Sequence, residues 1–478
     1  MMEELEAMGS SSIPGLEDRL AHMDFNEKML DLCFILDTTG SMGSYITAAT
    51  QNIELICSEI INSERLASPE CLRIGLIAYR DHPPQEMSYV TIKFEFTSNP
   101  KEVQGHLKSL WASGGGDGPE AVAAAMHEAL KLDWRPQASR MAVLITDAPP
   151  HGIGEYGDGF SKGDPSGHDP LKLARQMAQA GISLFVVACE PAFSGYAFSN
   201  DFFRAITKIT SATMLPLTTA NLLPHVIVGS AFEQMDMERL IREVGQAVAE
   251  RVVGGQESVD DVARELHEKL LLRNESTKQL IVEDIYRDSD EAQHNVDVWI
   301  AAPDIQSAKP HLKRIIGSRF TDKYLQSRYS SSYASSSSSR VHPVPLPSRK
   351  KVPSSRIRTS TSSPPRRVIS DFKVFSTDLP KSFSDHGTSE ISPSKLSFNS
   401  SPLKDQKRNT VFGSSSDSEG EEPIEGLGAE GNDQWSTTTK STGQSEGNGS
   451  TVDVKHGSIS FDQARRITTS AAWRTIRT

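Results

Sequence analysis

Residues 31–43, Asp-Leu-Cys-Phe-Ile-Leu-Asp-Thr-Thr-Gly-Ser-Met-Gly, place three oxygen-bearing side chains directly after an apolar run. In an extended backbone, side chains two residues apart point the same way, so Asp37, Thr39 and Ser41 direct one carboxylate and two hydroxyls to a common point. Hard oxygen donors of this kind suit Mg2+, and Mn2+ or Ca2+ could take its place. The stretch therefore predicts a buried strand that ends at a metal site.

Three features of the chain indicate the architecture around this strand. Continuous apolar runs at residues 32–36, 72–79, 141–145 and 182–188 predict strands covered on both faces. Between and after them, helical spacing occurs at residues 46–61, 121–132, 171–179 and 223–252. Residues 90–96 instead alternate between apolar and polar side chains, which indicates an edge strand with one wet face. This order predicts an α/β fold with a doubly wound, mostly parallel, Rossmann-like sheet.

Four ordered motifs carry a family resemblance. They are Asp-Thr-Thr-Gly-Ser-Met at 37–42, Arg-Ile-Gly-Leu-Ile-Ala-Tyr-Arg-Asp-His at 73–82, Gly-Gly-Gly-Asp-Gly-Pro-Glu-Ala at 114–121 and Ile-Thr-Asp-Ala-Pro-Pro-His-Gly at 145–152. The set resembles the von Willebrand factor type A domain, and most closely the type A domain associated with alpha-kinases. That family's metal-ion-dependent adhesion site usually has serine where Thr39 stands, and threonine keeps the hydroxyl. The resemblance implies a von Willebrand A-like domain over residues 27–252.

The resemblance adds two acidic residues to the metal site. Asp147 ends the apolar run 141–147, so like Asp37 it follows a strand, at the edge where open α/β sheets bind ligands. Asp117 stands in a loop where many type A domains place a threonine ligand. As a third carboxylate it would make the metal a poorer acceptor for a partner's acid group. Alternatively, Asp117 caps a helix, because Asp-Gly-Pro-Glu at 117–120 has the form of a capping box.

Polar residues in two further loops have open roles. In the loop after Asp147, the side chains of His151, Asp158, Asp164 and His168 could form a second metal site, contact a partner or simply be solvated. Just past another predicted strand, Arg80, Asp81 and His82 could pair locally or border the same rim.

Two enzymatic interpretations compete with the metal site. Residues 39–43 are close to the nucleophile elbow of serine hydrolases, but that turn favours glycine at position 39. Ser41 as a metal ligand also uses Asp37 and Thr39, which a hydrolase would leave without a role. Residues 152–157 satisfy Gly-x-Gly-x-x-Gly, yet they follow two prolines and lead into a loop instead of a helix. We expect no catalytic activity and no kinase domain.

Composition and cysteine usage bear on where the protein acts. The chain has 478 residues and a net charge of −12. All four cysteines fall inside the expected type A domain without a Cys-x-x-Cys pair, which predicts reduced thiols of a cytosolic protein. Residues 1–26 lack the apolar core of a signal peptide, and we expect no membrane span. The expected location is the cytoplasm, with the nucleus as the alternative.

The last third of the chain differs in composition. Residues 323–478 are rich in serine and poor in large apolar residues, which predicts a disordered tail. Its basic block, residues 340–370, could contact nucleic acid or anionic lipid, although a solvated tail is favoured because aromatic residues are not interleaved. An acidic block follows at residues 413–435, and several serines are candidate sites for kinases.

Residues 255–320 are expected to form a small extension, with a helix at 259–273 and a strand at 295–301. Together these observations predict an intracellular recognition or scaffold protein, in which a partner's Asp or Glu completes the metal shell. The alternatives are a serine hydrolase that uses Ser41 and a regulatory component of a protein-kinase complex.

Overall fold

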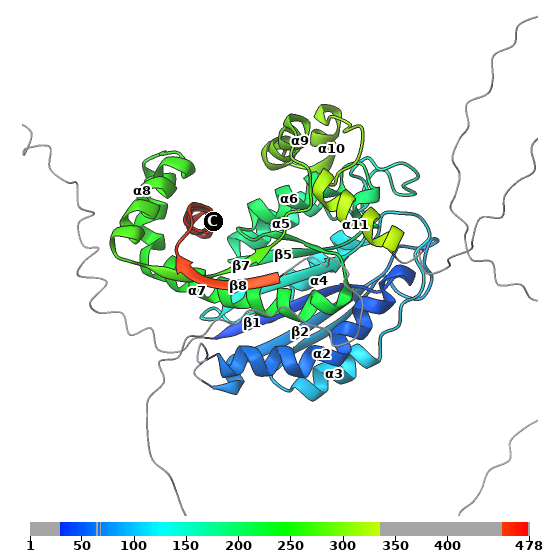
Figure 1. Cartoon of the computed structure of the whole chain (residues 1–478), viewed down its shortest axis with the longest axis horizontal. Coiled ribbons are helices and arrows are strands. Elements are labelled where there is room, and N and C mark those ends of the chain that lie inside the picture. Colours follow the sequence, from blue (N-terminus) through cyan, green and yellow to red (C-terminus); the bar gives the residue numbers. More distant parts are fainter. Residues whose placement is uncertain (1–28, 64–65, 67, 335–451, 477–478) are drawn as a thin grey trace, which may run out of the picture. The chain divides into compact units, whose positions relative to one another are not determined.

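The computed structural model describes residues 29–63, 66, 68–334 and 452–476. Six strands form the central sheet in the order β3-β2-β1-β4-β5-β6 (Figure 1). They are β1 (Leu30–Asp37), β2 (Leu72–Tyr79), β3 (Thr91–Thr97), β4 (Ser139–Thr146), β5 (Ile182–Cys189) and β6 (Met214–Leu217). β3 runs antiparallel to β2 at one edge, and the other strands pair in parallel. The predicted doubly wound, mostly parallel sheet is confirmed.

Side chains of alternate residues on each central strand pack into two separate cores. On β1, Leu32, Phe34 and Leu36 join the core on one face, whereas Cys33 and Ile35 join the core on the other. The first core is covered by α2 (Gly43–Asn62), α3 (Pro100–Lys108) and α7 (Leu223–Ala249). The second is covered by α4 (Val122–Leu130), α5 (Pro170–Gln179) and α6 (Ser199–Ile209). Because both faces are dry, the strands read as continuous apolar runs.

The edge strand β3 follows its predicted pattern. Lys93 and Glu95 are exposed, while the residues between and beside them are half-buried. The strand therefore has one wet face, as its alternation indicates.

Residues 255–320 pack on the same body, and one predicted strand there is wrong. The predicted helix at 259–273 is α8 (Val259–Leu272), and it is followed by β7 (Ser276–Val282). Residues 295–301, expected as a strand, lie in the helix α9 (Asp290–Ala301), which precedes α10 (Ile305–Ala308). Ser289 caps the start of α9, and the fully buried Trp299 packs against Phe202 with ring centroids 5.2 Å apart. Packing against α6 thus outweighs the β-type alternation of its valines.

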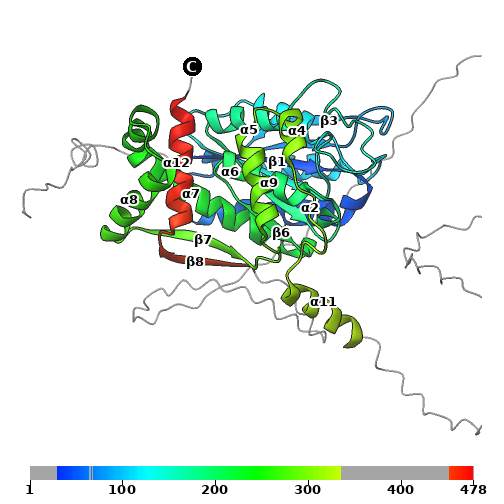
Figure 2. The ribbon, with the colours of Figure 1, turned by 90° about the horizontal axis from the view of Figure 1, so that it is seen from above.

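The prediction of disorder to residue 478 is wrong at both ends of the tail. Residues 322–334 form α11 (Asp322–Ala334), and near the C-terminus β8 (Val452–Ser458) is followed by α12 (Phe461–Thr475). β8 pairs antiparallel with β7, and α12 lies alongside α7 and α8 (Figure 2). The residues between, including the basic and acidic blocks and the candidate kinase sites, lie outside the described residues, as do residues 1–26.

The docked C-terminal segment is held by apolar and charged contacts. Ile459, Ile467 and Ala471 complete a core with α7 and α8. Ser460 and Gln463 form a capping box at the start of α12. This segment has few large apolar residues, so its composition resembles that of a disordered chain, although its buried face packs against α7 and α8.

All four cysteines are free and buried, as predicted. Of the helices within the described ranges, none combines the length and apolar character that crossing a membrane requires.

Candidate functional site

Three loops, which follow β2, α3 and β4, meet near the carboxyl end of β1, and backbone hydrogen bonds join them there. The carbonyl of Thr38, just past β1, accepts a hydrogen bond from the amide of Ser113 at 3.1 Å. The amide of Ala121 donates to the carbonyl of Arg80 at 3.0 Å, and that of Glu120 to Pro149 at 2.9 Å. Three loops, at residues 80–90, 111–121 and 147–169, therefore form one rim around the end of β1.

Asp37 and its neighbours form the first part of this rim. The Asp37 side chain is fully buried, and its Oδ1 accepts from the hydroxyl of Thr39 at 2.7 Å and from the Thr39 amide at 2.9 Å. Its Oδ2 accepts from the hydroxyl of Thr146 at 3.2 Å. Asp147 is 7% exposed and is hydrogen-bonded by the Ser41 hydroxyl. The structure thus brings together four of the five predicted ligands.

Electrostatics at this position favour a bound cation. Burial and then the nearby charge of Asp147 raise the pKa of Asp37 to about 7, although hydrogen bonds from Thr39 and Thr146 oppose the shift. Burial also raises the pKa of Asp147, and the hydrogen bond from Ser41 opposes it. Two carboxylates that both resist ionisation when close together are stabilised by a dication between them. The residues present therefore fit a divalent metal.

Glu120 is a third buried carboxylate that the sequence interpretation missed. It is 4% exposed, and its Oε2 has no hydrogen-bond partner among the described residues. Burial, then the charges of Asp37 and other acids, raise the pKa of Glu120 to about 10. A Cβ on Gly115 would lie 2.9 Å from its Oε1 and 3.5 Å from the Cβ of Thr39, so Glu120 and Thr39 flank the same glycine. In the sequence, the only signal of this buried carboxylate is that Glu120 follows a glycine-rich loop.

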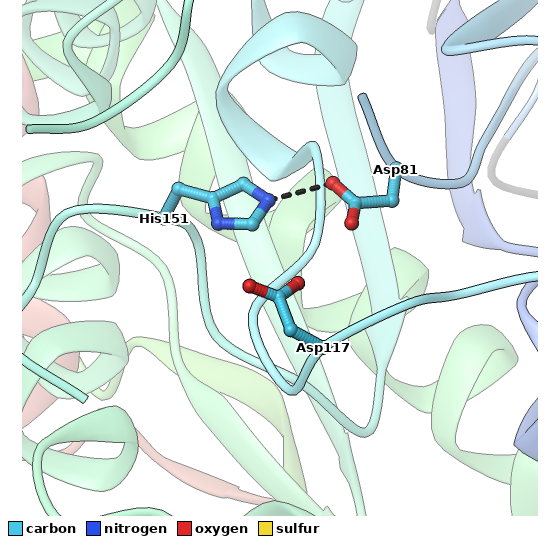
Figure 3. Close-up of side chains that lie close together, drawn as sticks. All are labelled: Asp81, Asp117 and His151. Carbon is cyan, nitrogen blue, oxygen red and sulfur yellow. Dashed lines mark hydrogen bonds and ion pairs between the residues drawn. The ribbon is translucent and has the colours of Figure 1, made fainter. Parts of the chain in front are cut away.

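The alternative role of Asp117 as a helix cap is wrong. α4 begins at Val122, its N-cap residue is Ala121, and no side chain caps it. Asp117 instead accepts a hydrogen bond from the amide of Gly159 and lies beside Asp81 and His151 (Figure 3). Ligation of the Asp37 metal by Asp117 remains a prediction.

Comparison with known proteins identifies the family of this region. Residues 31–156 match the family described as von Willebrand factor A domain. The chain contains a von Willebrand factor A domain. Such domains generally mediate protein–protein interaction and often bind a divalent metal.

Three relatives match part of this chain. The alpha-protein kinase vwkA of Dictyostelium discoideum is 34% identical over 145 residues, which are 29% of this chain and 22% of the kinase. The von Willebrand factor A domain-containing protein 7 of Homo sapiens is 33% identical over 141 residues, 28% of this chain and 14% of that protein. The putative ariadne-like RING finger protein R811 of Acanthamoeba polyphaga mimivirus is 26% identical over 202 residues, which are 41% of this chain and 19% of the viral protein. This chain thus spans about a fifth or less of their lengths.

Two histidines of the rim loops in this von Willebrand factor A domain, His82 and His151, are paired with acids. His151 Nε2 lies 2.6 Å from Asp81 Oδ1, and its Nδ1 lies 2.8 Å from Asp158 Oδ1. Burial lowers the pKa of His151, but the carboxylates of Asp158 and Asp81 outweigh it and raise the pKa to about 9. The four residues considered for a second metal site do not form one cluster, because Asp164 pairs with His82 and His168 stacks on His127.

Arg80 holds the rim of the domain together. Its buried guanidinium donates to the Ser88 hydroxyl at 2.6 Å, to the Trp111 carbonyl at 2.8 Å and to the Thr38 carbonyl at 3.3 Å. It also packs over the rings of Tyr89 and Trp111, 4.5 and 5.2 Å from their centroids. Arg80 is therefore a positioning residue for the loops around Asp37.

Each of the three rim loops exposes a large apolar side chain. Met87 is 77% exposed, Trp111 is 60% exposed and Tyr156 is fully exposed. Exposed large apolar side chains on loops that also carry buried polar groups are typical of a protein-binding surface.

Proposed function

We propose that this von Willebrand factor A domain binds an acidic side chain of a protein partner through a divalent cation held by Asp37, Thr39, Ser41 and Asp147. The observation that carries the proposal is the pair of buried carboxylates, Asp37 and Asp147. The hydrogen-bond donors to Asp37 within the described residues are threonine hydroxyls and an amide, which supply no compensating charge. Mg2+ is the proposed ion, and Mn2+ or Ca2+ could replace it.

The residues of this site have distinct roles in the proposal. Asp37 and Asp147 supply the negative charge, and Thr39 orients Asp37 through its hydroxyl and its amide. Ser41 is exposed, so its hydroxyl is the ligand nearest the solvent side. When bound, the cation supplies a coordination position for an oxygen of the partner's Asp or Glu.

The exposed rim extends the proposed contact beyond one carboxylate. Met87, Trp111 and Tyr156 would bury apolar area around the acidic group, which supports a protein partner over a small anion. The four reduced, buried thiols support an intracellular location, the cytoplasm or the nucleus.

The enzymatic alternatives are less well supported by the geometry. A serine hydrolase would need a base for Ser41, but both ring nitrogens of His151 are engaged by Asp81 and Asp158. A regulatory role in a protein-kinase complex draws on the similarity to the Dictyostelium alpha-protein kinase, which covers 22% of that protein.

The experiment that tests the proposal is titration of the full chain with Mg2+ after removal of metals by EDTA. We expect Ser41→Ala and Asp37→Asn to weaken Mg2+ binding by about tenfold or more, since each removes a ligand or its charge. Ser44→Ala is the matched control, because Ser44 is an exposed serine at the second position of α2. Equal Mg2+ affinity in wild type and both site variants would refute the site, and metal-independent labelling of Ser41 by an active-serine probe would favour a hydrolase.

A further inference from the structure

A second cluster of potential metal ligands lies beside the Asp37 site. One ligand atom from each of Asp81, Asp117 and His151 lies within 4.8 Å of the others. Figure 3 shows the three side chains facing a common centre. The residues come from three different rim loops, so no local motif encodes the cluster.

Two carboxylate oxygens in this cluster are buried without a hydrogen-bond partner among the described residues. Asp81 is fully buried, and its Oδ2 is unpartnered, whereas its Oδ1 accepts from the amide of His82 at 2.6 Å and contacts His151. Oδ1 of Asp117 is also unpartnered, whereas its Oδ2 accepts from Gly159. Buried charged oxygens are costly when unpaired, so these two oxygens mark a place where a cation is stabilised.

Asp158 orients the imidazole of His151 for such a cation. Its Oδ1 contacts His151 Nδ1 at 2.8 Å and also accepts from the amide of Phe160 at 2.8 Å. Its Oδ2 accepts from the amide of Gly152 at 2.7 Å, so the carboxylate is fixed by the backbone. Histidines that bind metals usually donate their second ring N–H to a carboxylate in this way. Nε2 of His151 is thereby directed toward Asp81.

The geometry points to a second metal site, in which Oδ2 of Asp81, Oδ1 of Asp117 and Nε2 of His151 bind one transition-metal dication such as Zn2+. An imidazole ligand favours Zn2+ over Mg2+ and Ca2+. The ion would replace the proton that His151 Nε2 shares with Asp81. Three protein ligands leave a position for water or another ligand.

A metal ion bound at this site would cross-link the three rim loops. Each ligand shares its loop with one of the exposed side chains Met87, Trp111 and Tyr156. The inference does not depend on the proposed magnesium site, because His151 and Asp81 have no part in that site.

The test uses the full chain stripped with EDTA and titrated with Zn2+ in the presence of excess Mg2+. We expect wild type to bind one Zn2+, and Asp117→Asn and His151→Gln to weaken it by about tenfold or more. Asp117 is half-buried, and an asparagine there still accepts from the Gly159 amide, so this variant is expected to fold. Its melting temperature and the visible absorption of bound Co2+ provide readouts besides affinity.

Two controls separate this site from the Asp37 site. Asp133→Asn changes an aspartate whose side chain is 95% exposed, and Ser41→Ala disrupts the proposed magnesium site; both should retain wild-type Zn2+ affinity. The inference is overturned if Zn2+ binds equally to wild type, Asp117→Asn and folded His151→Gln. It is also overturned if Ser41→Ala loses Zn2+ while Asp117→Asn keeps it. Lost Mg2+ binding with intact Zn2+ binding in Ser41→Ala would leave the second site supported.

Discussion

Replacing Arg466 by methionine should destabilise the whole domain, although this residue lies in the last helix, α12. Nη1 of Arg466 lies 2.7 Å from Oε1 of Glu233 on α7, and its Nε donates to the carbonyl of Ser211 at 3.1 Å. The two charged side chains are 8% and 9% exposed. The substitution therefore leaves a buried carboxylate without its counter-charge.

The magnitude follows from this burial. Breaking a buried ion pair by removing one partner costs about 3–5 kcal/mol. At about 2 °C per kcal/mol for a large domain, the melting temperature should fall by roughly 6–10 °C. The neighbouring Arg465 offers a matched control, because its pair with Asp260 is exposed on both sides. Arg465→Met should cost at most about 1 kcal/mol.

Thermal and urea unfolding, followed by tryptophan fluorescence, measure the single variants Arg466→Met, Arg465→Met and Glu233→Gln and the double variant that combines Arg466→Met with Glu233→Gln. Adding Glu233→Gln to Arg466→Met removes the stranded charge and keeps an acceptor for the Leu280 amide, which lies 3.4 Å from Oε2 of Glu233. We expect the double variant to recover more than half of the lost stability. The docking of α12 on α7 would be refuted if the losses of unfolding free energy in Arg466→Met and Glu233→Gln simply added in the double variant. It would also be refuted if Arg466→Met lost no more stability than Arg465→Met.

Three further predictions concern the core, the metal site and the rim. Trp299→Ala should destabilise the protein by about 3–5 kcal/mol in urea unfolding, because the buried ring packs on α6; a loss below about 1 kcal/mol would contradict that packing. In EDTA, the melting temperature should fall as the pH rises from about 4 to 8. The raised pKa of Asp37, about 7, makes the folded state hold a proton that the unfolded state has already lost. Excess Mg2+ or Asp37→Asn should flatten this fall, and an unchanged slope in both would argue against a buried charge there. Tyr156→Ala should leave both stability and Mg2+ affinity unchanged but weaken capture of the partner, as judged by a Mg2+-dependent pull-down with Leu272→Ala as an exposed control.

Local sequence patterns are sufficient to predict the strands of the sheet and part of the candidate site. Alternating burial on β1 and the two-residue spacing of Asp37, Thr39 and Ser41 are properties of one short segment, so they can be read without the fold. The helix at residues 290–301 was missed because alternating valines also suit a strand, and only packing of Trp299 on α6 decides between them.

The sequence by itself determined the fold class, the apolar strands and the oxygen-rich turn after the first strand. Only the tertiary structure decided that Glu120 is buried close enough to Asp37 to feel its charge, that Asp117 lies with Asp81 and His151, and that residues 452–476 return to complete the body. The physical reason is distance along the chain. Strand and helix preferences arise from neighbouring residues, whereas the charge, burial and partners of a loop carboxylate depend on which strand ends lie side by side. That order is set by packing across the whole sheet.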